Sequence, residues 1–315
     1  MEESLFEVEG IGQAMGGIHT HDERAVAQFS QPYAGGGSDA GLAHAALATV
    51  KKESHNGFTT SMNGPARGGQ SLAIHDIQMY FETAGEGAPL LFLHGFSGIG
   101  SDWDYVSAEV PAGYRLILPD LRGHGRSTNP LPEFSFRQSA LDVFALLDQL
   151  GIDKFQAIGV SGGGQTLLHM ATQQPSRVDA MVLVSTAHYF PEQARAVMRQ
   201  MTLESHTEQE WTVMRRRHPQ GVDQIRALWR QAHDLRDSFA DVNFTPPYLS
   251  TITARTLIVQ GDRDPLYPID IACEMYRSIP GARLWIVPNA GHGMIFQKQA
   301  PHFVETAVGF LGEQS

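Results

Sequence analysis

From residue 71 onward, short apolar runs alternate with amphipathic stretches. The runs that predict β-strands cover residues 71–75, 77–85, 89–95, 114–120, 155–160, 179–186, 255–261 and 283–289. The first two flank Asp76, as in a hairpin. Helical periodicity covers residues 101–110, 135–151, 163–175, 270–279 and 301–313. Continuous apolar strands that alternate with helices predict an α/β fold with a mostly parallel central sheet and helices on both faces.

One long interval interrupts this alternation. Residues 187–250 separate two predicted strands and contain three helical patterns, at residues 191–201, 208–218 and 222–233. Long insertions between sheet strands are usually functional, and ligands of open α/β sheets bind at the carboxyl edge. We therefore interpret 187–250 as a helical cap over that edge. The core then consists of residues 73–186 and 251–315.

The first 72 residues lack a lasting period and hold 12 of the 32 glycines. This composition predicts a flexible extension outside the core. The stretch HTHDE at 19–23 has only two histidines and no further ligand cluster, so we expect a solvated tail rather than a metal site.

Composition narrows the possible partners. The net charge of −11 argues against nucleic acid or an anionic membrane surface as the main partner. No run of about 20 apolar residues predicts a membrane span, and the N-terminus lacks the apolar region of a secretory signal. The single cysteine, Cys273, fits a reducing, cytoplasmic location. The sequence leaves open whether the chain forms a homo-oligomer.

The stretch AIGVSGGGQTLL at 157–168 places Ser161 between a predicted strand and a helix. In that setting G-x-S-x-G is typical of a nucleophile elbow. Gly159 and Gly163 remove side chains that would clash across the tight turn. Ser161 then stands exposed beside the positive end of the helix, and the N–H of Gly162 can bind an oxyanion.

A serine nucleophile needs a base and a group that orients the base. His292 follows the last predicted strand, and Asp264 follows the strand at 255–261. We predict Ser161, Asp264 and His292 as a catalytic triad, with Asp262 as the alternative acid. Asp262 directly follows Gly261 and is more typical of a residue that caps the turn.

The second oxyanion donor should come from the loop after the strand at 89–95. We assign it to the N–H of Phe96. His94 in the same loop, and His124 in DLRGHGRS, are interpreted as loop braces, although His94 is a competing base.

These motifs together resemble the α/β-hydrolase superfamily over about residues 72–312. The matching stretches are LHGF, LPDLRGHGRS, GVSGGG, GDRDPLYP and NAGHG. The resemblance implies the α/β-hydrolase fold and is nearest to capped esterases and carbon–carbon bond hydrolases. Epoxide hydrolases and haloalkane dehalogenases of this superfamily carry aspartate where Ser161 stands. Meta-cleavage product hydrolases often have a Gly-Pro-Gly turn, whereas this chain has HGFSGIGSDW.

The expected activity is hydrolysis of small to medium carboxylic esters through an acyl-enzyme, without a metal or organic cofactor. A carbon–carbon bond hydrolase, a cofactor-free perhydrolase and a ligand-binding receptor of the same fold are the alternatives. The expected pocket residues are Phe96, Trp103, Tyr189, Phe190, Tyr267 and Met294. Trp211 and Trp229 could line the pocket or pack within the cap itself. Carbon–carbon hydrolysis would require a carboxylate contact, from Arg195, Arg199, Arg215 or Arg230.

Overall fold

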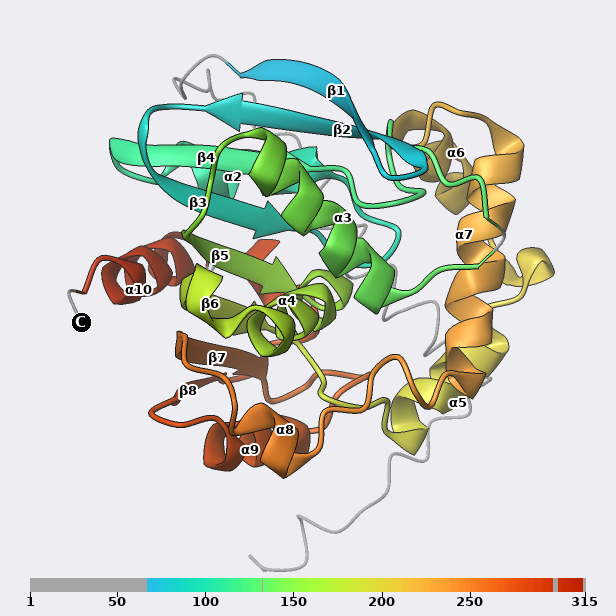
Figure 1. The fold of residues 1–315 in the computed structure, drawn as a ribbon. Coiled ribbons are helices and arrows are strands. Elements are labelled where there is room, and N and C mark those ends of the chain that lie inside the picture. The colour runs from blue at the N-terminus through green and yellow to red at the C-terminus, as the bar shows by residue number, and fades with distance from the viewer. Residues whose placement is uncertain (1–66, 132, 297–299, 314–315) are drawn as a thin grey trace, which may run out of the picture. The chain divides into compact units, whose positions relative to one another are not determined.

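The computed structural model describes residues 67–131, 133–296 and 300–313 (Figure 1). The HTHDE stretch and residues 1–66 of the predicted extension lie outside the described residues. The described N-terminal strand begins at Gly68, so the predicted boundary at residue 72 falls inside a strand.

An eight-stranded sheet forms the centre of the described chain. Its strands are β1 (Gly68–Ile74), β2 (Ile77–Ala84), β3 (Gly87–Leu93), β4 (Gly113–Pro119), β5 (Phe155–Val160), β6 (Val178–Val184), β7 (Arg255–Gly261) and β8 (Arg283–Val287). They lie in the order β1-β2-β4-β3-β5-β6-β7-β8. The pairs β1–β2 and β2–β4 are antiparallel, and the other neighbours are parallel. This arrangement confirms the predicted mostly parallel sheet and the hairpin around Asp76.

Helices cover both faces of the sheet, as expected. They are α2 (Asp104–Ala108), α3 (Phe136–Gln149), α4 (Gly162–Gln173), α5 (Glu192–Gln200), α6 (Glu208–Arg217), α7 (Val222–Asp234), α8 (Pro246–Leu249), α9 (Ile269–Ser278) and α10 (Ala300–Leu311). One apolar core includes side chains of α3, α4 and α9, and a second includes side chains of α2 and α10. The buried positions of β3, β5 and β6 are apolar, as expected where helices pack on both sides of a sheet.

Local sequence explains where the helices begin and end. Ser135 precedes α3, and its hydroxyl accepts a hydrogen bond from the N–H of Gln138 at 3.3 Å. Gly151 follows the helix with a φ of 70°, a conformation that glycine adopts without strain. The predicted stop at this residue is therefore confirmed.

Helices α5, α6 and α7 all come from the interval between β6 and β7. Figure 1 shows them beyond the ends toward which the arrows of β3 and β5 point. The loops that follow the parallel strands open at this same edge, so side chains from the helical segment 187–250 can meet residues from those loops.

Candidate active site

Ser161 occupies a strained turn between β5 and α4. Its φ of 50° and ψ of −116° lie outside the regions that L-residues normally adopt. Such conformations cost about 1–3 kcal/mol and persist only where the surroundings enforce them. A Cβ on Gly159 would lie 2.7 Å from the carbonyl oxygen of Gly163, and one on Gly163 would lie 2.1 Å from that of Leu93. Both positions therefore require glycine, as the sequence predicts.

His292 and Asp264 are in direct contact. The Nδ1 of His292 lies 2.8 Å from Oδ2 of Asp264, and the two side chains are 6% and 0% exposed. The N–H groups of Leu266 and Tyr267 donate to Oδ1 of Asp264 at 2.8 and 3.1 Å. Burial acts to raise the pKa of Asp264, but His292 and these N–H groups outweigh it, so the pKa lies below its ordinary value. Asp264 is thus held as a carboxylate beside the imidazole.

The alternative acid, Asp262, has a different place. Its Oδ1 accepts a hydrogen bond from the N–H of Ala290 at 3.3 Å. This contact ties the turn after β7 to the loop that leads to His292. Asp262 therefore braces the turn, and Asp264 makes the contact with the imidazole.

The two predicted oxyanion donors lie together. Gly162 is the first residue of α4, so its N–H has no partner within the helix. A Cβ added to Gly162 would lie only 3.1 Å from the backbone nitrogen of Phe96. The loop with Phe96 also approaches Ser161, because a Cβ on Gly95 would lie 3.5 Å from Cβ of Ser161.

His94 and His124 hold this loop in place. The Nδ1 of His94 lies 2.8 Å from the carbonyl of Gly95, and its Nε2 accepts from the N–H of Leu121 at 2.9 Å. The Nδ1 of His124 lies 2.9 Å from the carbonyl of Arg122. Burial lowers the pKa of His94 well below its ordinary value and that of His124 to about 4. Both rings are therefore neutral braces at neutral pH.

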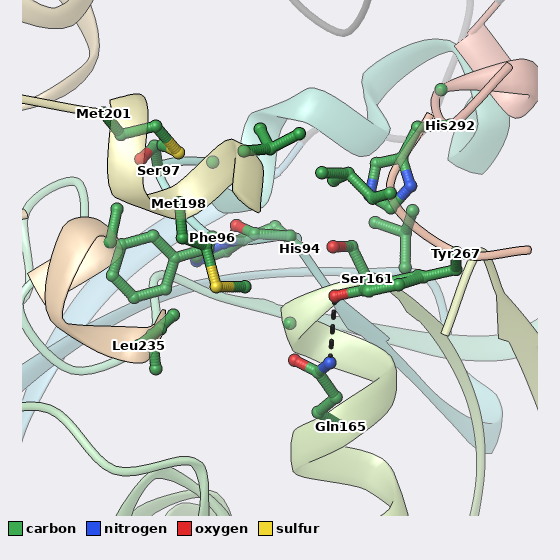
Figure 2. Close-up of a pocket in the computed structure, with 18 of the residues that line it drawn as sticks. His94, Phe96, Ser97, Ser161, Gln165, Met198, Met201, Leu235, Tyr267 and His292 are labelled. Carbon is green, nitrogen blue, oxygen red and sulfur yellow. Dashed lines mark hydrogen bonds between the residues drawn. The ribbon is translucent and has the colours of Figure 1, made fainter. Parts of the chain in front are cut away.

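A largely apolar cavity connects these groups (Figure 2). Its polar lining includes Ser161, His292, Tyr267 and Gln165. Figure 2 shows these four on one side, opposite a second set of side chains. That second set includes Phe96, Met198, Met201 and Leu235. Because Met198 belongs to α5 and Leu235 follows α7, the helical segment 187–250 supplies part of the wall.

The structure places only some of the expected pocket residues in this cavity. Phe96, Phe190 and Tyr267 line it. Trp103 and Met294 are instead 0% and 1% exposed within the core that contains side chains of α2 and α10. Tyr189 is 37% exposed and packs its ring on His188. The prediction that these three residues line the cavity is therefore corrected: Trp103 and Met294 are buried in a core, and Tyr189 is exposed at the surface.

The two tryptophans of the helical segment pack against each other. The ring centroids of Trp211 and Trp229 are 4.4 Å apart, in a cluster with Met214, Ile225 and Leu228. Neither is among the residues that line the cavity. Of the two interpretations of these residues, the structure favours packing within the helical segment.

None of the four arginines considered for carboxylate binding lines the cavity. Arg195 donates to the backbone carbonyls of Phe190, Arg236 and Ser238. Arg199 and Arg215 form ion pairs with Glu192 and Glu208, and Arg230 donates to a carbonyl of its own helix. The arginine that does line the cavity is Arg217, which forms an ion pair with Asp102. Sequence reasoning missed it because three consecutive arginines end α6 and nothing in their spacing distinguishes the third.

A second contact that the sequence did not indicate joins Tyr267 to Ser161. Its hydroxyl accepts a hydrogen bond from Nε2 of Gln165 at 3.1 Å and also interacts with the side chain of Ser161. Its ring lies 5.3 Å from that of His292. Burial raises the pKa of Tyr267 further above its ordinary value, so the phenol is protonated. Tyr267 therefore contacts Asp264 through its backbone N–H and Ser161 through its hydroxyl.

The described residues contain no group of three or more His, Cys, Asp and Glu side chains placed to hold a metal ion. Every helix in the described ranges is too short or too polar to cross a bilayer.

The chain resembles known proteins both in sequence and in fold. Residues 88–246 match the family model described as the alpha/beta hydrolase fold, and residues 241–312 match one described as TAP-like protein. A 2-hydroxy-6-oxo-6-phenylhexa-2,4-dienoate hydrolase of Comamonas testosteroni is 26% identical over 76% of this chain and 93% of its own length. A non-heme haloperoxidase of Rhodococcus erythropolis is 27% identical over 70% of this chain and 92% of its own. The solved meta-cleavage product hydrolase from Pseudomonas fluorescens IP01 superposes with a TM-score of 0.65 at 21% identity, over 77% of this chain and 97% of that one.

Proposed function

Because the chain belongs to the α/β-hydrolase family, we propose that it is a serine hydrolase that cleaves carboxylic esters of small to medium acyl or aryl groups. The observation that carries this proposal is the buried His292–Asp264 pair, which opens onto the same cavity as Ser161. The family hosts several reactions on one fold, so the activity depends on the site rather than on the fold.

In the acylation step, His292 takes the proton of the Ser161 hydroxyl as the oxygen attacks the ester carbonyl. Asp264 keeps the imidazole in the tautomer that can accept this proton and stabilises its positive form. The N–H groups of Phe96 and Gly162 bind the negative oxygen of the tetrahedral intermediate, and such a donor is typically worth about 3 kcal/mol. His292 then protonates the leaving alcohol.

In the deacylation step, water gives its proton to His292 and attacks the acyl-enzyme, and the free acid leaves. The Ser161 hydroxyl is regenerated with the proton that His292 returns. The Tyr267 hydroxyl, beside Ser161, keeps the oxygen of the nucleophile oriented between these steps.

The lining of the cavity is suited to a substrate with an uncharged acyl or aryl group. Most of the lining is apolar, with Phe136, Phe190, Val197, Met198 and Leu235 among its members. Burial of an apolar acyl chain against these side chains contributes about 0.8 kcal/mol per methylene. Selectivity among chain lengths would follow from how far the cavity extends.

Carbon–carbon bond hydrolysis is the second candidate, and the relative from Comamonas testosteroni favours it. That relative's named substrate is a dienoate, which carries a carboxylate. The four arginines considered for a carboxylate contact make other contacts, and the cation in the wall, Arg217, already pairs with Asp102. The site therefore favours the ester over the dienoate. Because one relative is a haloperoxidase, perhydrolysis should also be assayed as a side activity.

The test is a series of 4-nitrophenyl esters from acetyl to decanoyl, assayed beside the Ser161→Ala variant. We expect turnover in the unchanged protein and a loss of at least about 10⁴-fold in the variant, as for other serine nucleophiles. Activity that survives in Ser161→Ala would reject Ser161 as the nucleophile. Failure of the unchanged protein on every ester, with turnover of a dienoic diketo acid, would replace ester hydrolysis with the second candidate.

A further inference from the structure

An ion pair between Arg217 and Asp102 forms part of the cavity wall. Arg217 is the last residue of α6, and Asp102 lies in the short helix η2 (Gly100–Trp103). The two side chains are 10% and 15% exposed. Phe96, whose N–H is one of the proposed oxyanion donors, and its neighbour Ser97 line the same cavity. The pair therefore lies where a substrate in the cavity can meet it.

Asp102 is fixed in this position by its own loop. Its Oδ2 accepts a hydrogen bond from the N–H of Ile99 at 3.1 Å, while Oδ1 faces Arg217. A Cβ on Gly98 would lie 2.9 Å from Oδ2, so the loop backbone closes around the carboxylate. Asp102 cannot turn away from Arg217 without giving up the contact that holds this loop.

In this ion pair one guanidinium and one carboxylate compensate each other's charge. Burial lowers the pKa of Arg217 to about 10, which leaves the guanidinium protonated. His94, which also lines the cavity, is neutral because burial lowers its pKa well below the ordinary value. Arg217 also borders a second cavity, whose charged groups are Glu82, Asp120, Arg126 and Arg216. Besides Arg217, the lining there holds two acidic and two basic side chains, and Arg126 pairs with Glu82 at 3.4 Å.

We propose that the Arg217–Asp102 pair makes the cavity selective for substrates without a carboxylate. A substrate carboxylate would have to compete with Asp102 for the guanidinium and would leave Asp102 buried without its partner, which is costly. An uncharged amide, ester or hydroxyl oxygen can instead accept one of the remaining N–H groups of Arg217, which has five. This inference deepens the proposed ester hydrolysis by defining its substrate class as uncharged esters.

Direct binding tests the inference without turnover. The ligands are 4-phenylbutyrate and the matched amide 4-phenylbutanamide, titrated by calorimetry at neutral pH into protein with Ser161→Ala. We expect the amide to bind at least about 10-fold more tightly, which is the size of effect that one charge-assisted hydrogen bond produces.

Four further proteins on the same background complete the design. Asp102→Asn leaves Arg217 uncompensated, so it should shift the affinity ratio at least about 10-fold toward the carboxylate. Arg217→Gln should shift the ratio further toward the amide. The double variant, which is again uncharged, should return close to the starting ratio. Glu192→Gln, which frees the exposed Arg199 outside the cavity, is the matched control and should change nothing. Melting curves establish that each variant folds, and the double variant keeps the test valid if one single variant does not.

Three results would overturn the inference: tighter binding of the carboxylate to the starting protein, a ratio that Asp102→Asn leaves unchanged, or binding of neither compound. Failure of the ester assay has a different meaning. If no ester is turned over but the affinity ratios follow the expected pattern, the ester hydrolysis is rejected and the selectivity for uncharged ligands stands.

Discussion

The carboxyl edge of the sheet and the helical segment 187–250 build the same cavity in different ways. At the sheet edge, Ser161, Asp264 and His292 each stand in the loop after a parallel strand. Backbone geometry fixes them, through the strained turn at Ser161 and the N–H groups that hold Asp264. In the helical segment, the cavity wall consists of side chains whose positions depend on how α5, α6 and α7 pack.

This difference separates chemistry from selectivity. The groups that would react are held by hydrogen bonds and close backbone contacts, which tolerate little change. The groups that shape the cavity are apolar side chains such as Met198 and Leu235, which can change size while the sheet edge stays in place. Changes at the edge should therefore affect the rate, and changes in the helical segment should affect which substrate reacts.

The largest effect should come from the acid at the sheet edge. Asp264→Asn keeps the size of the side chain but no longer holds the imidazole in the required tautomer, so kcat should fall about 10⁴-fold. The matched control is Asp262→Asn, which alters a turn-bracing contact two residues away and should change kcat by less than about 10-fold. The measurement is kcat for the best nitrophenyl ester. A comparable loss in both variants would mean that the turn as a whole, rather than the contact of Asp264 with His292, matters.

Much of the sheet edge was predictable because its signals are local. The strands at 155–160 and 255–261 were predicted with the observed bounds, and the glycines around Ser161 follow from a turn that excludes side chains. The cavity wall was less predictable, since an apolar pattern indicates that Trp103 or Met294 is buried but not on which side of the sheet. The Arg217–Asp102 pair joins residues 115 positions apart, and no local pattern connects them. The four-residue helix α8 is too short to show a period and was missed.

Substitutions of two methionines, Met294 and Met198, should distinguish the roles of the two regions. Met294→Ala empties a site in the core beneath the sheet edge and should lower the free energy of unfolding by about 2–5 kcal/mol, with the acyl-chain preference unchanged. Met198→Ala, in the cavity wall, should lower stability less and should favour longer esters, raising their kcat/KM about 10-fold relative to the acetyl ester. Urea unfolding and the ester series measure both quantities. A shifted chain preference in Met294→Ala alone would reverse the roles given to the two regions.

The smallest expected effect concerns pH and the histidines that brace the sheet-edge loops. The pKa values of His94 and His124 lie below their ordinary value because of burial, so the unfolded chain binds protons more readily than the folded protein. Stability should therefore fall as the pH drops below about 6.5, and above that pH these groups contribute no slope. For His124 the loss extends down to about pH 4, at about 1 kcal/mol per pH unit.

His124→Asn tests this assignment, because the amide can still donate to the carbonyl of Arg122 but does not titrate. In urea unfolding at pH 7, 6 and 5, this variant should lose less stability with acidification than the unchanged protein. His302→Asn, which replaces an exposed histidine on α10, should keep the original slope. If His124→Asn also keeps that slope, the acid sensitivity lies elsewhere than in the His124 brace.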